Sequence, residues 1–120
     1  MARILVIDDV VAQAFLRTFL QREGHEVLAA QTGSEGLRLF RTNAVDLILT
    51  TVSNIYGLEA LAQLRTEFPQ AKLIGMLPPG GTEEDFRPVV QSLRAQRTLT
   101  KPFKRKELLE TVTALLGANQ

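Results

Sequence analysis

Short apolar segments alternate with longer amphipathic segments along the chain. Five of the apolar segments are too short for a helix and are bounded by charged or turn-forming residues, a pattern typical of strands buried on both faces of a sheet. We expect strands over residues 4–7, 25–30, 45–51, 72–77 and 98–100.

Apolar residues at helical spacing predict a helix after each strand. We expect helices over 11–23, 33–42, 57–68, 85–93 and from about 103 to 116, with a loop over 52–57. Thr32 and Glu35 have the spacing of a capping box at the start of the second helix, and Gly36 weakens that helix slightly. Pro88 is compatible only with a first turn, so the fourth helix is expected to begin late, near Asp85.

Strict alternation of strands and helices predicts one α/β domain spanning residues 1–120. In such a domain a parallel sheet is covered by helices on both faces, with right-handed crossovers. A glycine-rich phosphate-binding fingerprint is missing after the first strand, which argues against a dinucleotide-binding protein.

Two acidic residues, Asp8 and Asp9, directly follow the first strand. In open α/β sheets ligands bind at the carboxyl ends of the strands. Two adjacent carboxylates repel each other, so such a fold usually offsets them with a cation or another positive group. The alternative is that both are solvated acids that begin the next helix.

Composition narrows the possible chemistry. The chain has no cysteine and one histidine, which excludes disulfides, thiolate zinc sites, cysteine nucleophiles and multi-histidine metal sites. His25 is interpreted as an ordinary surface residue. The apolar runs are far too short to cross a membrane, and no signal-peptide pattern precedes the first strand, so a cytoplasmic protein is expected.

Charge is unevenly distributed although the net charge is only +1. Residues 86–106 contain seven basic residues and no acid, which leaves −6 for the rest of the chain. Such asymmetry bears on partners rather than on fold. A solvated basic surface is favoured over binding of nucleic acid or of an acidic partner, since only Phe86 and Phe103 offer aromatic rings for stacking.

Four sequence segments together resemble the receiver domain of two-component response regulators: ILVIDD, GHEVLAAQTGSEGLRLF, VDLIL and TKPF. The resemblance covers essentially the whole chain in order. It implies a flavodoxin-like fold with strand order 2-1-3-4-5.

The resemblance also implies a set of site positions, of which this chain keeps only some. Asp8 and Asp9 match the family's magnesium-binding acidic pair, and Lys101, followed by a proline, matches the lysine that contacts the phosphoryl group. The aspartate that accepts a phosphoryl group from a histidine kinase corresponds to Thr51, or to Thr50 if the strand is shifted by one. The loop from Thr51 to Gly57 is also two residues shorter than the family's.

Two further positions of the family's switch are substituted. The Ser or Thr at the end of the fourth strand corresponds to Leu77, and the aromatic residue of the fifth strand corresponds to Thr98. Leucine cannot donate a hydrogen bond to a phosphoryl group, and threonine is too small to act as the moving ring.

These losses affect the chemistry directly. A carboxylate attacks phosphorus as an anion, whereas a threonine hydroxyl is protonated at neutral pH and needs a general base. Magnesium loses one carboxylate ligand, so any Mg²⁺ at Asp8 and Asp9 is expected to bind weakly. The favoured alternative is that Lys101 neutralises the acidic pair directly.

The sequence therefore predicts a non-enzymatic receiver-like module that is not phosphorylated in the usual way. It is expected to act through protein–protein contacts with a histidine kinase or an output domain, and to be able to form a homodimer through its fourth helix, fifth strand and fifth helix. Two alternatives remain open: phosphorylation on Thr51 or Thr50, and binding of nucleic acid or an acidic partner by residues 86–106. No membrane partner is expected.

Overall fold

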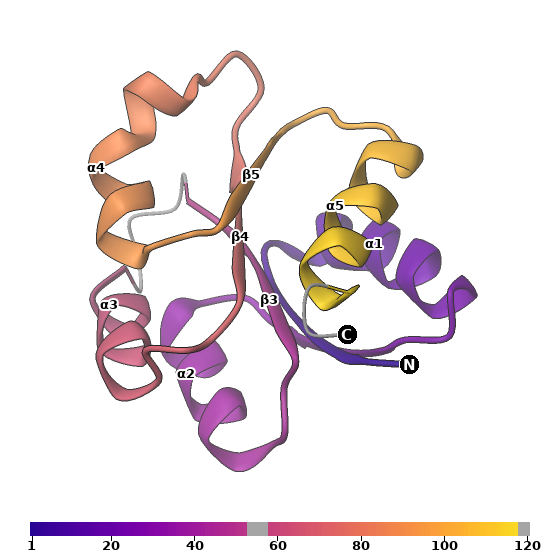
Figure 1. Cartoon of the computed structure of the whole chain (residues 1–120), viewed down its shortest axis with the longest axis horizontal. Helices are drawn as coiled ribbons and strands as arrows, with labels where there is room; N and C mark the ends of the chain where they lie inside the picture. Colours follow the sequence, from indigo (N-terminus) through magenta and orange to yellow (C-terminus); the bar gives the residue numbers. More distant parts are fainter. Residues whose placement is uncertain (53–57, 118–120) are drawn as a thin grey trace.

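The computed structural model describes residues 1–52 and 58–117, and shows five strands that alternate with five helices (Figure 1). The strands are β1 (Arg3–Ile7), β2 (Glu26–Ala30), β3 (Leu47–Thr51), β4 (Leu73–Leu77) and β5 (Arg97–Thr100). The helices are α1 (Val10–Arg22), α2 (Gly33–Thr42), α3 (Leu58–Glu67), α4 (Glu83–Leu93) and α5 (Arg105–Gly117).

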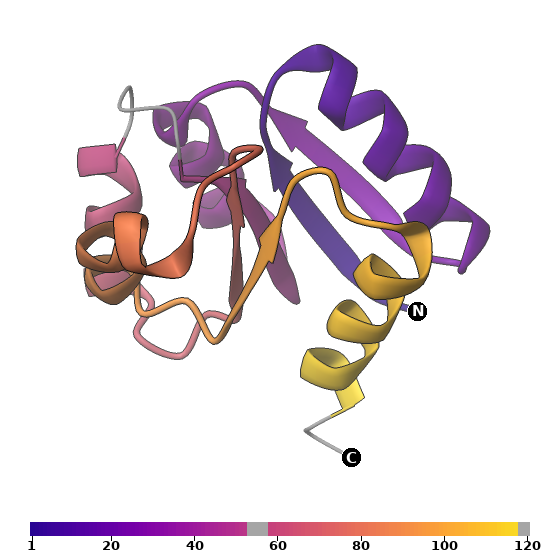
Figure 2. The same cartoon turned by 90° about the horizontal axis from the view of Figure 1, so that it is seen from above.

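The five strands form one parallel sheet in the order β2-β1-β3-β4-β5. The predicted fold class and the strand order 2-1-3-4-5 are thus confirmed. Helices α1 and α5 cover one face of the sheet, and α2, α3 and α4 cover the other (Figures 1 and 2). The carboxyl ends of all strands consequently meet at one edge of the sheet.

Two apolar clusters hold these layers together, one on each face of the sheet. Ile4, Val6, Leu47 and Leu49 pack toward α1 and α5. Their chain neighbours, including Leu5 and Ile48, pack toward α2, α3 and α4. Side chains alternate between the two faces along a strand. The face on which a residue near a strand end lies therefore follows from the cluster to which its second neighbour along the strand belongs.

The fourth helix corrects the sequence-based prediction. It begins at Glu83, earlier than the expected Asp85, and Pro88 lies inside it. The reason is a capping box: the Thr82 hydroxyl accepts the Asp85 N–H at 3.1 Å, and the Asp85 carboxylate accepts the Thr82 N–H at 3.3 Å. This cap stabilises the start of the helix at Glu83. The helix therefore forms although Pro88 has no N–H to donate to a backbone carbonyl.

The expected capping box of α2 is only half formed. The Thr32 hydroxyl accepts the Glu35 N–H at 3.1 Å, but the Glu35 carboxylate accepts the N–H of Gln31 instead of that of Thr32. Gly36 has a packing reason to lie in this helix, because a Cβ there would collide with the side chain of Ile7 on β1. The expected loop over 52–57 lies, from residue 53 on, outside the described residues.

A buried arginine joins the carboxyl-terminal ends of α3 and α4. Arg65 is 2% exposed, and its guanidinium donates to the carbonyls of Leu93 at 2.7 Å and Ala71 at 2.7 Å. Further carbonyl contacts come from Phe68, Pro69 and Arg94. Burial, and then the nearby Arg94, lower the pKa of Arg65 below its usual value. Arg65 is buried next to Leu64 on α3, and this network explains how a charge occupies a buried position.

No helix in the described ranges is both long and apolar enough to cross a membrane.

Candidate functional site

The first residue of the acidic pair, Asp8, is buried at the carboxyl end of β1, a strand inside the sheet. Its side chain is only 5% exposed. One carboxylate oxygen, Oδ1, accepts the N–H of Asp9 at 2.8 Å. Gln13 of α1 supports this turn by donating its amide to the carbonyls of Asp8 at 2.9 Å and Ala30 at 3.0 Å.

The second carboxylate oxygen of Asp8 is paired with Lys101. The distance from Lys101 Nζ to Asp8 Oδ2 is 2.5 Å, and the lysine side chain is 25% exposed. The backbone N–H of Lys101 donates to the carbonyl of Leu77 at 2.9 Å, and the peptide bond to Pro102 is cis. The structure thus brings together residues 93 positions apart in the sequence. A positive group offsets one member of the acidic pair, as one of the sequence interpretations proposed.

The second acid, Asp9, has a different environment. It is exposed and caps α1, since its Oδ1 accepts the N–H of Ala12 at 2.8 Å. For Asp9 the alternative interpretation, an acid that begins the next helix, describes the contacts well. The two neighbouring carboxylates therefore have separate structural tasks.

Thr50 and Thr51 close β3 next to β1, with Thr50 in register with Ile7. Thr50 is fully buried, and its hydroxyl donates to the carbonyl of Thr51 at 3.0 Å. Thr51 is 9% exposed. By the alternation along β3, Thr51 lies on the α1–α5 face with Leu49, which is also the face of Asp8, whereas Thr50 lies on the opposite face. Thr51 is therefore the threonine at the edge of the sheet that shares a face with the ion pair.

The donor set at this edge fits an ion pair better than a magnesium site. Magnesium usually takes one or two carboxylates together with waters and substrate phosphates. Both Asp8 oxygens already accept hydrogen bonds, and Asp9 caps a helix. Among residues 1–52 and 58–117, no group of three or more acidic, histidine or cysteine side chains is arranged to hold a metal.

The two residues predicted at the switch positions, Leu77 and Thr98, lie on the other face of the sheet. Leu77 is fully buried in the cluster beneath α2, α3 and α4. Thr98, on β5, donates its hydroxyl to the carboxylate of Glu83 in the first turn of α4. Sequence reasoning missed Glu83, because nothing in its local pattern indicates a contact with a residue 15 positions away.

The basic stretch is partly neutralised in the fold. Besides Lys101, Arg105 lies 3.8 Å from Glu23, and Lys106 lies 3.8 Å from Glu110. These outer pairs are exposed and contribute little stability. They nevertheless weaken the case for a continuous positive surface along residues 86–106.

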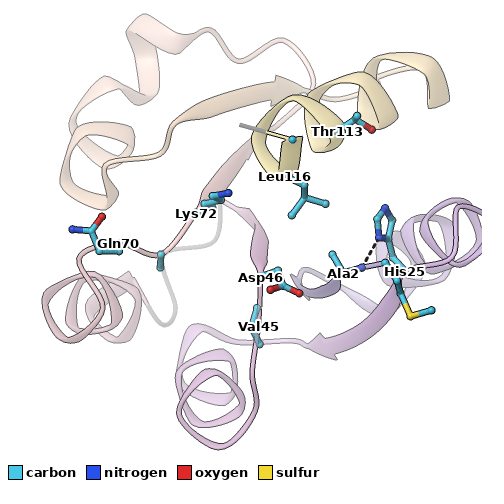
Figure 3. A pocket seen from close by; sticks show the side chains of 11 residues that line it. Ala2, His25, Val45, Asp46, Gln70, Lys72, Thr113 and Leu116 are labelled. Atoms are coloured by element: carbon cyan, nitrogen blue, oxygen red, sulfur yellow. Dashed lines mark hydrogen bonds between the residues drawn. The ribbon is translucent and has the colours of Figure 1, made fainter. Parts of the chain in front are cut away.

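A separate cavity of about 550 Å³ lies at the amino-terminal edge of the sheet, away from Asp8 and Lys101 (Figure 3). Its polar groups already serve the backbone. His25 Nδ1 accepts the Ala2 N–H at 3.1 Å, Asp46 accepts the Arg3 N–H at 2.8 Å, and Lys72 donates to the Leu115 carbonyl at 2.9 Å. His25, expected to be an ordinary surface residue, is thus half-buried and hydrogen-bonded. It lies at the wrong edge of the sheet to serve Thr51 as a base.

Comparison with known proteins adds an independent finding. A family model, described as "Response regulator receiver domain", matches residues 4–113. Protein PilH of Pseudomonas aeruginosa is 29% identical over 120 residues, which cover 98% of this chain and 99% of PilH. The alkaline phosphatase synthesis transcriptional regulatory protein PhoP of Bacillus subtilis is 33% identical over 122 residues, 98% of this chain but only 50% of PhoP.

Solved structures are similar over the same extent. The response regulator protein TrrA of Thermotoga maritima, in complex with Mg²⁺–BeF, has a TM-score of 0.82 and 31% identity, and the match covers 97% of this chain and 100% of TrrA. A chemotaxis protein, CheY4 of Vibrio cholerae, has a TM-score of 0.85 at 24% identity, which speaks for the fold alone.

Proposed function

This chain belongs to the response regulator receiver family, and we propose that it is a receiver-like module that is not phosphorylated at the usual position and acts by binding another signalling protein. One observation carries the proposal. Thr51, which corresponds to the family's acceptor aspartate in the sequence resemblance, ends β3 beside β1 on the face of the sheet that carries the Asp8–Lys101 ion pair, and this supports the proposal.

Phosphoryl transfer to Thr51 would need a group that removes the hydroxyl proton. Asp8 is engaged with Lys101 and with the Asp9 N–H, and His25 lies at the opposite edge of the sheet. The single histidine of the chain is therefore not placed to act as a base for Thr51. This favours an unmodified Thr51 over phosphorylation on Thr51 or Thr50.

Magnesium would supply charge neutralisation for an incoming phosphoryl group, and Asp8 and Asp9 are the residues that would hold it. The ion pair competes for this role, because Lys101 already neutralises Asp8. We infer that the chain binds Mg²⁺ weakly and that the Asp8–Lys101 pair serves mainly to fix the carboxyl ends of β1 and β5 relative to each other.

The switch positions support the same conclusion. Leu77 offers no hydrogen-bond donor, and the Thr98 hydroxyl is directed to Glu83. A phosphoryl group at Thr51 would thus find no side-chain relay to α4. We propose that the domain stays in one state or is regulated by its partner.

The remaining features of the proposal follow from the family. Receiver domains interact with histidine kinases and output domains and are typically not enzymes. We propose that residues 1–120 form one such domain, that it is cytoplasmic, and that α4, β5 and α5 are available for homodimer formation. The match spans only half of PhoP, so the proposal concerns this domain and does not carry over the activity of PhoP as a whole.

Incubation with acetyl phosphate and Mg²⁺, followed by intact-mass measurement, tests the proposal. The expected result is no gain of a phosphate, while a receiver domain that has its aspartate gains one in parallel. A gain that survives acid would indicate phosphothreonine, and a gain that hydroxylamine removes would indicate an acyl phosphate. Either gain contradicts the proposal.

A further inference from the structure

The cavity at the amino-terminal edge of the sheet is lined by charges of both signs. Its walls are formed by the residues just before β1, β2, β3 and β4 and by the last turns of α5. Asp46 and Lys72 come from two of these strand starts, and Figure 3 shows Leu116 of α5 above Asp46. A cavity with a few convergent polar groups is the usual form of a small-ligand site, so the chemistry of these groups decides what could bind.

The two charged side chains are held by the backbone and not by each other. Asp46 Oδ2 accepts the Arg3 N–H at 2.8 Å, and the Asp46 N–H donates to the Arg3 carbonyl at 2.8 Å. Lys72 Nζ donates to the Leu115 carbonyl at 2.9 Å. Within residues 1–52 and 58–117, no ion pair joins Asp46 to Lys72. Both charges are therefore positioned before a ligand arrives, which lowers the entropy cost of binding.

The polar groups of the cavity have hydrogen-bonding capacity beyond these backbone contacts. A carboxylate has two acceptor oxygens and an ammonium has three donors, whereas the backbone engages one oxygen of Asp46 and one donor of Lys72. His25 Nδ1 accepts the Ala2 N–H, so in the neutral ring Nε2 carries the proton and can donate. Burial lowers the pKa of His25, which favours this neutral form at neutral pH.

The presence of both signs selects the class of ligand. A simple anion is attracted by Lys72 but repelled by Asp46, and a simple cation meets the reverse, so the two contributions oppose each other for either ion. A small molecule that carries an ammonium and a carboxylate group gains from both. Val45, Ala71 and Leu116 also line the cavity, so part of its wall favours an apolar group on the same ligand.

We propose that this cavity binds a free α-amino acid with an apolar side chain, with its ammonium group at Asp46 and its carboxylate at Lys72. The inference goes beyond the proposed function, because the cavity lies away from Asp8 and Lys101 and needs no phosphoryl chemistry. Asp46 is exposed and Lys72 is half-buried, so solvent weakens both charged contacts. The expected dissociation constant is therefore on the order of 1 mM.

The test uses the intact chain and three probes that share one apolar side chain. Leucine carries both charges, leucinamide keeps only the ammonium, and N-acetylleucine keeps only the carboxylate. Backbone amide NMR titration to about 50 mM is expected to show saturable shifts with leucine at residues 1–2, 25, 45–46, 70–72 and 113–117. Leucinamide and N-acetylleucine are each expected to bind at least about threefold more weakly, because each loses one charged contact.

Two variants and a matched control assign each charge of the ligand to its partner. Asp46→Asn keeps an acceptor for the Arg3 N–H and is expected to abolish the preference for leucine over N-acetylleucine. Lys72→Gln keeps a donor for the Leu115 carbonyl and is expected to abolish the preference for leucine over leucinamide. Lys106→Gln makes the same change at an exposed position of α5 that does not line the cavity, so both preferences should remain. Thermal melting checks that each variant is folded.

Three results would overturn the inference: equal binding of the three probes, shifts that lie elsewhere on the surface, or no saturable shift with leucine. The comparison of the probes needs only the unaltered chain, so a variant that fails to fold leaves the test intact. None of these readouts depends on phosphorylation. A phosphate gained from acetyl phosphate would contradict the proposed function without affecting the result for leucine.

Discussion

The two edges of the sheet use charged side chains in different ways. At the amino-terminal edge, Arg65, Lys72 and Asp46 all bind backbone groups. At the carboxyl-terminal edge, Asp8 binds Lys101 as well as the Asp9 N–H, and on the other face of the sheet Thr98 binds Glu83. A backbone partner is present whatever the sequence, whereas a side-chain partner can be lost by one substitution. The Arg65 network therefore depends little on other side chains, whereas the Asp8–Lys101 pair can be removed by a single substitution.

The largest predicted effect is at Arg65. Arg65→Met would leave several buried carbonyls without donors, and we expect the free energy of unfolding to fall by roughly 3 kcal/mol in urea denaturation. Arg65→Lys should recover only part of this, because an ammonium has three donors and cannot reproduce the planar fork of a guanidinium. Equal stability of Arg65→Met and the unaltered chain would remove the structural role assigned to this edge.

The Asp8–Lys101 pair should show strong coupling. Lys101→Met leaves a buried carboxylate unpaired, and we expect a loss of about 2 kcal/mol at neutral pH. Asp8→Asn in addition removes that charge, so the double variant should be more stable than Lys101→Met alone. A double-mutant cycle by chemical denaturation measures the coupling, and additive effects would show that the pair does not join β1 to β5.

A smaller effect is expected between β5 and α4. Thr98→Val keeps the shape of the side chain but removes the donor to Glu83, and should cost about 1 kcal/mol, since the bond is to a charged but exposed group. Glu83→Gln retains an acceptor and should cost less. Hydrogen exchange of the α4 amides measures whether the Thr98–Glu83 contact stabilises this helix. Unchanged exchange rates in Thr98→Val would show that the contact does not stabilise α4.

His25 gives the smallest effect and has a defined sign. Burial and the positive N-terminus lower its pKa in the fold, and Nδ1 accepts the Ala2 N–H only when it is unprotonated. As the pH falls below 6.5, the ordinary pKa of histidine, His25 binds more protons in the unfolded state than in the folded state. The His25 contribution to stability should therefore be complete above about pH 6.5 and decrease slightly as pH falls below that value. His25→Asn should flatten this slope, and an unchanged slope would assign the pH dependence to other groups.

The fold could be predicted almost completely from the sequence, because the apolar runs and the helical spacing are local signals. The error at α4 has a local cause: the prediction rests on Pro88 alone, whereas the Thr82–Asp85 cap begins the helix at Glu83. The site was harder to predict. Asp8, Asp9 and Lys101 could be placed from the family resemblance, but the different tasks of the two acids, the Thr98–Glu83 bond and the backbone network of Arg65 depend on contacts between distant residues.

The most direct test of the central claim compares the unaltered chain with Thr51→Asp in acetyl phosphate and Mg²⁺, read by intact mass. The account predicts that the unaltered chain stays unmodified. Thr51→Asp, which restores a third carboxylate beside Asp8 and Asp9, is predicted to gain one phosphate that hydroxylamine removes. A phosphate on Thr51 or Thr50 of the unaltered chain would contradict the account.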